Sequence, residues 1–311
     1  MLKSRLFAVE AFMSDTPKTS SDDSLSRFIF DGADIRGEIV TLADSYAAVL
    51  ANNPAPAAVQ QLLGEFLAAA ALLSSTLKFD GIITLQAQGD GPVPVIMAEC
   101  NHHHGLRGTV RPPEAGFSDG LTGDLGDLIG QGVLAITIDP DKGERYQGVV
   151  PLDKPTLAAC LEAYFAQSEQ LGTRIWLEAD QGRAAGLLIQ ALPTQLAASI
   201  EDNQAQWDTV IALATTVTQN ELLSLDHSSN LYRLFNEMQV RVFEPATLQF
   251  QCTCSEQRSL SALAQIGREE CEEILSEQGV INIDCQFCNQ HYAFGAAQIR
   301  ALFEDSPPTM H

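Results

Sequence analysis

The sequence is poor in basic residues. Its 311 residues include 18 lysines and arginines against 40 aspartates and glutamates, which gives a formal net charge of −22. Proteins bind the phosphate backbone through positive side chains that displace its counterions, and a surface of the opposite sign repels it. Nucleic acid is therefore excluded as an expected partner.

Long hydrophobic runs are also missing. The longest, FLAAAALL at residues 66–73, is far shorter than the roughly 20 apolar residues that cross a bilayer, so no membrane contact is expected. The N-terminal MLKSRLFAVEAF has a short apolar patch interrupted by Glu10 and no clear cleavage site. We interpret residues 1–24 as a disordered leader, with Met13 as a candidate start, and expect a cytoplasmic protein. In that compartment structural disulfides are rare.

Catalytic motifs are absent as well. GQGVLA at residues 130–135 has part of the spacing of a dinucleotide-binding loop, but it opens a strand where that loop would open a helix. QGDGP at residues 88–92 is typical of a hairpin turn and lacks the Lys-Ser/Thr pair of a phosphate loop. We find no serine elbow with histidine and aspartate partners, and no suggestive pair of carboxylates. The sequence therefore predicts a protein that is not an enzyme.

The patterns that are present are typical of an α+β fold. Apolar residues at positions 35, 39, 42, 46 and 49 recur with a helical period and predict an amphipathic helix. A second helix is predicted after NNPAPA, in an Ala- and Leu-rich segment with a broad apolar stripe. From residue 80 the period changes, and GIITLQAQ, VPVIMAEC, GVLAITID and RIWLEAD are short β-rich runs between turn residues.

A third helix is predicted at residues 157–170, with Cys160 as a buried core thiol on its apolar face. We assign all of these segments to one core α+β domain over residues 25–194. Residues 195–250 predict helices that are too short to be stable alone, and we interpret them as a metastable helical linker docked on the core. Trp207 lies on the apolar stripe of the first of these helices, whereas Trp176 belongs to a core strand, so only Trp207 is expected to report on the linker.

Cysteine is scarce but clustered near the end of the chain. Cys252 and Cys254 form a Cys-x-Cys pair, and Cys285 and Cys288 form a Cys-x-x-Cys pair. Two such pairs supply the four thiolates of a closed tetrahedral zinc site, and four unrelated core cysteines would not be paired in this way. We therefore predict a C-terminal zinc-binding domain over residues 251–311.

Other candidate ligands fit this role less well. Cys271 is flanked by four glutamates, which raise the pKa of a thiol, and its spacing with Ile274 and Leu275 places it on the apolar face of a helix. The three histidines of NHHHG, His102 to His104, point in different directions in an extended or turn segment, and we interpret them as a solvated turn.

The chain resembles the family of redox-regulated 33-kDa heat-shock proteins, bacterial holdase chaperones that oxidation activates. The motifs that carry the resemblance are CTCS and CQFCN, preceded by LYRLF, together with LKFDG, QGDGP, RYQGVVPL, YFAQSEQ and LLIQALP. They cover nearly the whole chain after about Leu25. Cys271 and the leader lie outside the family pattern.

The resemblance implies one zinc ion per chain on Cys252, Cys254, Cys285 and Cys288 in the reduced, inactive protein. Oxidation would join Cys252 to Cys254 and Cys285 to Cys288, release the zinc, unfold the C-terminal domain and expose the linker. The active form would bind unfolding client proteins and prevent their aggregation under oxidative stress, as a homodimer.

Two other classes share these cysteines. A thiol-disulfide oxidoreductase uses a Cys-x-x-Cys motif, but usually at the N-terminus of a helix, whereas INIDCQFCNQHYAF is flanked by strand-like sequence. A zinc-ribbon adaptor for nucleic acid would need a basic face, and residues 251–300 contain three arginines and no lysine. Suppression of client aggregation without turnover would separate the holdase from both.

Overall fold

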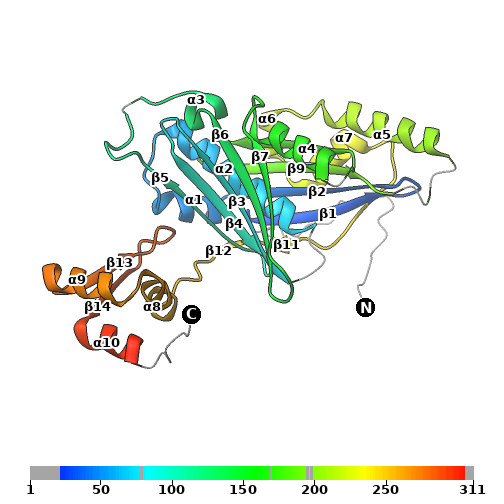
Figure 1. Cartoon of the computed structure of the whole chain (residues 1–311). Helices are drawn as coiled ribbons and strands as arrows, with labels where there is room; N and C mark the ends of the chain where they lie inside the picture. The colour runs from blue at the N-terminus through cyan, green and yellow to red at the C-terminus, as the bar shows by residue number, and fades with distance from the viewer. Residues whose placement is uncertain are drawn as a thin grey trace, which may run out of the picture. The chain divides into compact units, whose positions relative to one another are not determined.

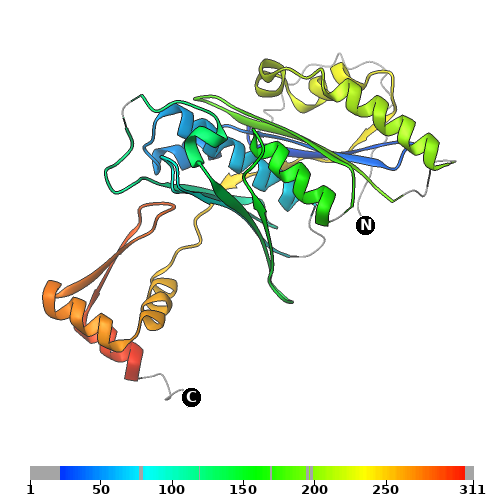
Figure 2. The same cartoon turned by 45° about the horizontal axis from the view of Figure 1, so that its top comes forward.

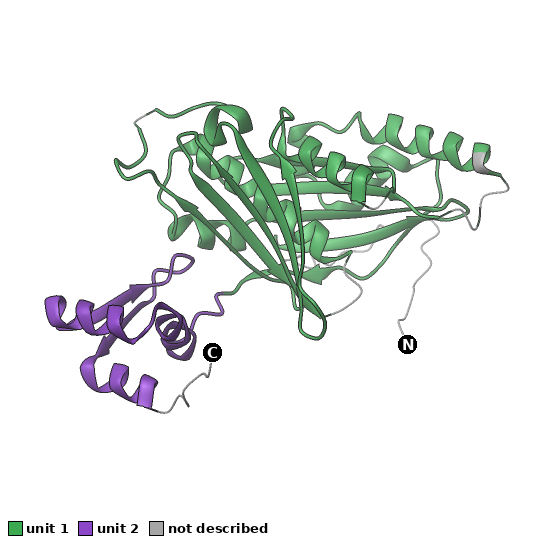
Figure 3. Ribbon diagram, in the orientation of Figure 1, with its two compact units in different colours: residues 1–251 green, residues 252–311 purple. Residues whose placement is uncertain are grey.

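A computed structural model describes residues 22–76, 80–118, 120–168, 170–193, 196 and 199–304. The chain divides into two compact units, residues 1–251 (unit 1) and residues 252–311 (unit 2), shown in Figure 3. Each unit has a hydrophobic core of its own. We describe the two in turn.

Unit 1 contains two sheets of six strands each in the described part of the chain (Figure 1). The first, sheet A, is antiparallel with the order β10-β1-β2-β9-β8, and β11 also pairs with β1. Its strands are β1 (Ser24–Phe30), β2 (Ile35–Leu42), β8 (Thr173–Ala179), β9 (Ala184–Ala191), β10 (Val240–Val242) and β11 (Ala246–Thr247). Sheet B has the order β12-β5-β4-β3-β6-β7. Its strands are β3 (Gly81–Gly89), β4 (Val95–Asn101), β5 (Gly105–Arg111), β6 (Gly132–Pro140), β7 (Tyr146–Pro151) and β12 (Gln249–Phe250).

Helix α2 (Ala57–Ser74) fills the space between the two sheets (Figure 2). Apolar side chains surround it, and it contacts strands of both sheets. By length and composition α2 could cross a membrane, with a mean hydropathy of 1.4, but 72% of it is buried inside unit 1. A helix that is apolar all round is a core helix when protein covers every face. Three more helices complete the core: α1 (Asp44–Ala51), α3 (Leu125–Ile129) and α4 (Leu157–Ser168), which packs on β8.

Most of the predicted core elements are confirmed, including α2, α4 and the strands β3, β4, β6 and β8. The predicted helix over positions 35–49 is wrong in its first half. Residues Ile35–Leu42 form β2, which pairs with β1 on one side and β9 on the other, and the helix α1 begins only at Asp44. A central strand that is buried on both faces has no alternation of apolar and polar residues, so its sequence can match a helical period by chance.

Residues 1–21 of the predicted leader lie outside the described residues. Its last residues belong to the fold, since Ser24 begins β1 and Asp23 is buried. The Asp23 carboxylate accepts hydrogen bonds from the backbone N–H groups of Ala43 and Ser45 and from the Ser45 hydroxyl. These bonds satisfy backbone donors at the start of α1, where no residue of the helix can do so.

Residues 195–250 contain strands as well as helices, which corrects the expectation of helices alone. The helices are α5 (Ile200–Ala214), α6 (Gln219–Ser224) and α7 (His227–Phe235), followed by β10, β11 and β12. After Phe235 the chain forms short strands instead of a further helix. These strands pair with the edge strands β1 and β5. The helices α5 to α7 cover one face of sheet A (Figure 2).

The contact between these helices and sheet A is a continuous apolar cluster, which we call the sheet–helix interface. Phe235 of α7 lies edge-on to Phe30 of β1, with ring centroids 5.0 Å apart. The Phe28 ring packs over Gly37, where a Cβ would lie 2.2 Å from the ring, so only glycine leaves room for it. The fully or nearly fully buried members are Phe28, Phe30, Ala33, Ile35, Ile39, Ala185, Leu187, Ile189, Val210, Ala214, Leu222, Leu223, Leu231, Leu234 and Phe235.

Unit 2 is small. Its elements are α8 (Glu256–Ile266), α9 (Arg268–Gln278), the hairpin of β13 (Val280–Asp284) and β14 (His291–Gly295), and α10 (Ala296–Glu304). Within residues 252–304 its core has five buried residues, namely Leu263, Cys271, Ile281, Phe294 and Ile299. A core of this size gives a chain of about sixty residues little stability of its own.

Candidate functional site

The Cys-x-Cys pair precedes helix α8 directly. Ser255 is the N-cap of that helix, and its hydroxyl accepts a hydrogen bond from the backbone N–H of Arg258. The Arg258 guanidinium returns to the loop and donates to the carbonyl oxygen and the hydroxyl of Thr253, at 3.0 and 2.6 Å. Thr253 separates the two cysteines, so this cap fixes the backbone that carries both thiols.

The Cys-x-x-Cys pair lies in the turn between β13 and β14. The backbone N–H of Cys285 donates to the carbonyl of Gln290 at 3.0 Å, and that of Asn289 donates to the carbonyl of Cys285 at 2.8 Å. Asn289 has a φ of 55°, a left-handed conformation that asparagine tolerates better than most residues. The turn therefore closes tightly on the two thiols.

The structure brings all four predicted ligands together. The sulfurs of Cys252, Cys254, Cys285 and Cys288 lie within 4.8 Å of one another. Two close contacts cross between the pairs, at 3.6 Å from the Cys252 sulfur to the Cys285 sulfur and 3.4 Å from the Cys254 sulfur to the Cys288 sulfur. A Zn–S bond of about 2.3 Å in a tetrahedron implies sulfurs about 3.8 Å apart, so the cluster matches a four-thiolate metal site in both ligand type and spacing.

The thiols influence one another strongly. Burial raises the pKa of Cys252, but a hydrogen bond from the backbone N–H of Cys254 and bonds from the neighbouring thiols outweigh it and lower the pKa to about 7. Burial and the adjacent thiols raise the pKa of Cys288 to about 12, and burial raises that of Cys285. Several thiolates at this spacing repel one another, and a bound dication would favour the deprotonated form of all four.

Tyr292 is a site residue that sequence reasoning missed. It lies on β14, and its hydroxyl donates a hydrogen bond to the Cys254 sulfur at 3.2 Å. This bond to the sulfur, followed by burial, raises the pKa of Tyr292 to about 12. Its position in the sequence, four residues after Cys288, does not indicate this role, because the partner sulfur is 38 residues away.

The other cysteines lie elsewhere. Cys271 is fully buried in the core of unit 2, where burial, followed by the charge of Glu270, raises the pKa of its thiol. Cys160 is buried on α4 as predicted, and Cys100 is buried on the inner face of β4. Among the residues that the structure describes, the four-cysteine cluster is the group with metal-binding spacing.

The histidines at residues 102–104 form the turn between β4 and β5. The rings of His102 and His103 contact each other at a tilt of 46°, with centroids 3.8 Å apart, and the backbone N–H of Gly81 donates to Nδ1 of His102 at 3.0 Å. His102 and His104 are half-buried, and His103 is exposed. The turn is confirmed, although it is less solvated than expected.

The position of the Cys-x-x-Cys pair argues against an oxidoreductase. In that class the motif begins a helix, whose N-terminus stabilises the attacking thiolate. Here the pair lies between two strands, and the nearest element on either side is β13 or β14.

Comparisons with known proteins agree with this site. The model of the family described as "Hsp33 protein" matches residues 23–295. The "33 kDa chaperonin" of Ectopseudomonas mendocina is 51% identical over 283 residues, which cover 91% of this chain and 95% of that protein. The protein of the same name from Pseudomonas syringae pv. syringae is 50% identical over 290 residues, which cover 92% and 96%.

The fold also has a match among solved structures. The crystal structure of the 33 kDa chaperonin, an Hsp33 homologue from Thermotoga maritima, superposes with a TM-score of 0.74 and covers 91% of this chain and 98% of that one. At 24% identity this match supports the fold alone. The family model and the close relatives, together with the four-cysteine cluster, establish that this chain belongs to the Hsp33 family of redox-regulated chaperones, which hold client proteins and are not enzymes.

Proposed function

We propose that the chain is a cytoplasmic, oxidation-activated holdase whose four clustered cysteines hold one zinc ion in the reduced protein. The observation that carries the proposal is the convergence of four thiols, from two distant parts of unit 2, to within 4.8 Å. Bound zinc would act as a structural cross-link between the loop before α8 and the β13–β14 turn. Those two segments are 30 residues apart in the sequence.

Oxidation removes the ligands. In the step that we propose, two thiolates of one pair give two electrons to hydrogen peroxide, whose O–O bond breaks and which takes up two protons to leave as two water molecules, while the sulfurs join in a disulfide. A disulfide sulfur is a poor metal ligand, so two such steps release the ion. Unit 2 then retains a core too small to keep it folded.

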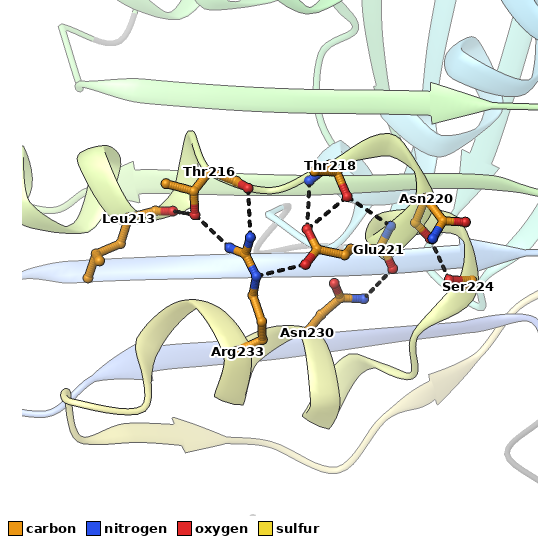
Figure 4. A network of polar contacts seen from close by, with 8 residues as sticks. All are labelled: Leu213, Thr216, Thr218, Asn220, Glu221, Ser224, Asn230 and Arg233. Atoms are coloured by element: carbon orange, nitrogen blue, oxygen red, sulfur yellow. Dashed lines mark hydrogen bonds and ion pairs between the residues drawn. The ribbon is translucent and has the colours of Figure 1, made fainter.

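The helices α5 to α7 are the proposed mobile element. Hydrogen bonds join them to one another (Figure 4): the Arg233 guanidinium binds the hydroxyl and carbonyl of Thr216 and the carboxylate of Glu221. The other Glu221 oxygen accepts hydrogen bonds from the N–H and hydroxyl of Thr218, which closes a capping box at α6. Asn230 of α7 donates to the carbonyl of Glu221 at 3.1 Å. The three helices are therefore expected to leave sheet A together.

The chain itself connects these helices to the cysteine site. Between α7 and Cys252 lie β10, β11 and β12, of three, two and two residues, which bind the edges of β1 and β5. Strands this short depend on the chain being held at both ends. When unit 2 unfolds, we expect these pairings to fray from β12 backwards and to release α7.

Release would expose the sheet–helix interface on both sides. The side chains of sheet A and of α5 to α7 that now bury one another would form an apolar surface able to hold unfolded segments of clients. The same surface could pair two activated chains, which would give the homodimer expected in the oxidised state.

The deciding experiment is an aggregation assay. Light scattering of a thermally unfolding client protein is recorded with the reduced protein and with the peroxide-oxidised protein. We expect suppression by the oxidised form alone, complete near a stoichiometric amount and without turnover. Equal suppression by both forms, or a catalytic effect on client disulfides, would contradict the proposal.

We predict that oxidation joins Cys252 to Cys254 and Cys285 to Cys288. In the folded cluster the contacts at 3.6 and 3.4 Å cross between the pairs, but the short chain within each pair keeps the sequence neighbour within reach as the ligands are oxidised. The Cys-x-Cys ring is small and strained and should be reduced first. Peptide mapping of the oxidised protein checks this, and mainly cross-pair bonds such as Cys254 to Cys288 would show the predicted pairing to be wrong.

We also predict that Tyr292→Phe speeds the response to peroxide. Loss of the hydroxyl removes a hydrogen bond that lowers the electron density on the Cys254 sulfur, while the ring keeps its place beside the core of unit 2. One such bond is worth about 0.5–1.5 kcal/mol, which corresponds to an increase of about 2- to 12-fold in the rate of zinc release. A colorimetric chelator measures that rate, and Tyr146→Phe, on an exposed tyrosine of β7, is the matched control. An unchanged rate of zinc release would show that the Tyr292 hydroxyl has no role at the cysteine site.

A further inference from the structure

A buried histidine lies inside the sheet–helix interface. His227 is the first residue of α7, and its side chain is only 9% exposed. Its Nδ1 lies 2.8 Å from the Ser26 hydroxyl of β1, and its Nε2 lies 3.1 Å from the Thr41 hydroxyl of β2. Both ring nitrogens of one linker residue are thus bound to the sheet that the linker covers.

The neutral ring fits this place well. A hydroxyl can donate to one ring nitrogen and accept from the other, so either tautomer is fully satisfied. Ser26 and Thr41 are buried as well, at 4% and 8% exposed, so water has little access to the ring. A histidine in such a place stabilises the docked helix as long as it carries no charge.

The charged form fits poorly. Protonation would place a cation in an apolar interface, and the hydroxyls of Ser26 and Thr41 carry no charge to balance it. The ring also lies in the first turn of α7, where the positive end of the helix dipole disfavours a cation.

The charged residues near His227 do not offset the cost of protonating its buried ring. The nearby charged residues of β1 and β2, Arg27 and Glu38, lie on the opposite face of sheet A, since strand side chains alternate. On α7, the carboxylate of Asp226 favours the charged ring, but it is already bound as the N-cap by the N–H and hydroxyl of Ser229. On α6, Glu221 is bound by Thr218 and Arg233.

We propose that His227 is an acid-sensitive latch, so that a fall in pH releases α5 to α7 from sheet A and activates the chaperone without oxidation or loss of zinc. The inference rests on the proposed function, because it assumes that the released helices and sheet hold clients. It adds a second trigger that acts directly on the linker and not through the cysteines.

The pH range of the effect follows from the difference in the pKa of His227 between the docked and the released helices. Burial, only partly offset by Asp226, lowers the pKa of His227 from an ordinary value of 6.5 to about 4 in the docked state. Because the folded pKa is depressed, docking is at full strength above pH 6.5 and weakens as pH falls toward 4. The docking equilibrium falls by about 10-fold at pH 5.5 and about 30-fold at pH 5.

The test uses the reduced, zinc-loaded full chain between pH 7.5 and 5. The measurements are client aggregation, hydrogen exchange of α5 to α7, and zinc content at each pH. We expect holdase activity and faster exchange to appear below pH 6.5 while zinc stays bound. His227→Gln keeps hydrogen-bonding groups but cannot be charged in this range, so it should stay inactive at pH 5.5, whereas His103→Gln, on the exposed turn residue, should behave as the natural chain does.

Two results would overturn the latch. One is identical acid activation of the natural chain and His227→Gln, and the other is activation that occurs only as zinc leaves. If His227→Gln does not fold, NMR titration of the natural chain decides: the ring of His227 should titrate far below 6.5 in the reduced protein and near 6.5 after oxidation. An ordinary pKa in the reduced protein refutes the proposal.

Failure of the latch is distinguishable from failure of the proposed function. The same chains are assayed after oxidation at pH 7.5, where His227 is neutral in both states. If the oxidised protein holds clients there but acid has no effect, the latch alone is wrong. If the oxidised protein holds no clients at pH 7.5, the proposed function is wrong.

Discussion

Cys285→Ser is expected to abolish stoichiometric metal binding and to unfold unit 2 in the reduced protein. Structural zinc contributes about 10–16 kcal/mol of apparent binding free energy, which is comparable to the whole stability of a typical domain. The core of unit 2 has five buried residues in its described part, and one of them is a cysteine. Without the metal, little remains to hold the loop before α8 against the β13–β14 turn.

The size of the effect separates a ligand from a supporting residue. Loss of a hydrogen-bond partner of a ligand typically weakens metal binding by about 10- to 100-fold. Loss of one of four thiolates should exceed that range. Elemental analysis of the purified reduced protein gives the metal content, and limited proteolysis within residues 252–304 reports whether unit 2 is folded.

Cys271 provides the control within the same unit. It is fully buried, and its sulfur lies 3.6 Å from the carbonyl oxygen of Leu263, away from the cluster. Alanine is the better replacement there, since a serine hydroxyl would be buried among apolar side chains. Cys271→Ala should therefore keep one metal ion per chain, and equal metal loss in both variants would refute the assignment of Cys285.

The cysteine site could be predicted from the sequence because its information is local. Two short motifs contain all four ligands, and the chemistry of thiolates restricts what such motifs bind. The contacts made by Tyr292 and His227 could not be predicted. Tyr292 reaches Cys254, and His227 reaches Ser26 and Thr41, only after the chain has brought together residues 38 to 201 positions apart.

The strands of sheet A other than β8 were missed for a related reason. Strands β3, β4 and β8 lie between turn residues and alternate in burial, so their sequences show a period of two. Strand β2 pairs with β1 and β9 within the sheet, and α2 covers one of its faces and the linker helices cover the other. It is therefore buried on both faces and shows no such period. The short strands β10 to β12 have no stability without their partners, so no local pattern predicts them.

Oxidation is expected to release α5 to α7 from sheet A while the strands β3, β4 and β6 of sheet B stay folded. The interface that holds these helices is one layer of apolar side chains, whereas the strands of sheet B pair along their length and pack against α2. Hydrogen exchange should therefore speed up in residues 200–250 of the oxidised protein and stay slow in β3, β4 and β6. An active oxidised protein with protected α5 to α7 would contradict this release.

The two tryptophans should respond together, which corrects the expectation from the sequence. Trp207 of α5 packs over Gly172, and Trp176 of β8 contacts the same sheet–helix interface from below. Release would expose both indoles to water, so Trp176→Phe and Trp207→Phe should each leave a fluorescence spectrum that shifts to the red on oxidation. Trp176 is therefore a second reporter of the linker and not an internal reference.

Phe235→Ala should produce the same release without an oxidant. Phe235 is 1% exposed and lies against Phe28 and Phe30, and truncation of a buried phenylalanine costs about 3–5 kcal/mol. In the reduced, zinc-loaded protein that cost acts on the docking of the three helices, since the other side of the contact belongs to a sheet that stays folded. Tyr232→Ala removes an aromatic ring from the same helix at a position 59% exposed, and should change neither hydrogen exchange nor client binding. Client holding by reduced Phe235→Ala, with zinc still bound, would place the holdase surface at the sheet–helix interface; an inactive variant with exposed α5 to α7 would place it elsewhere.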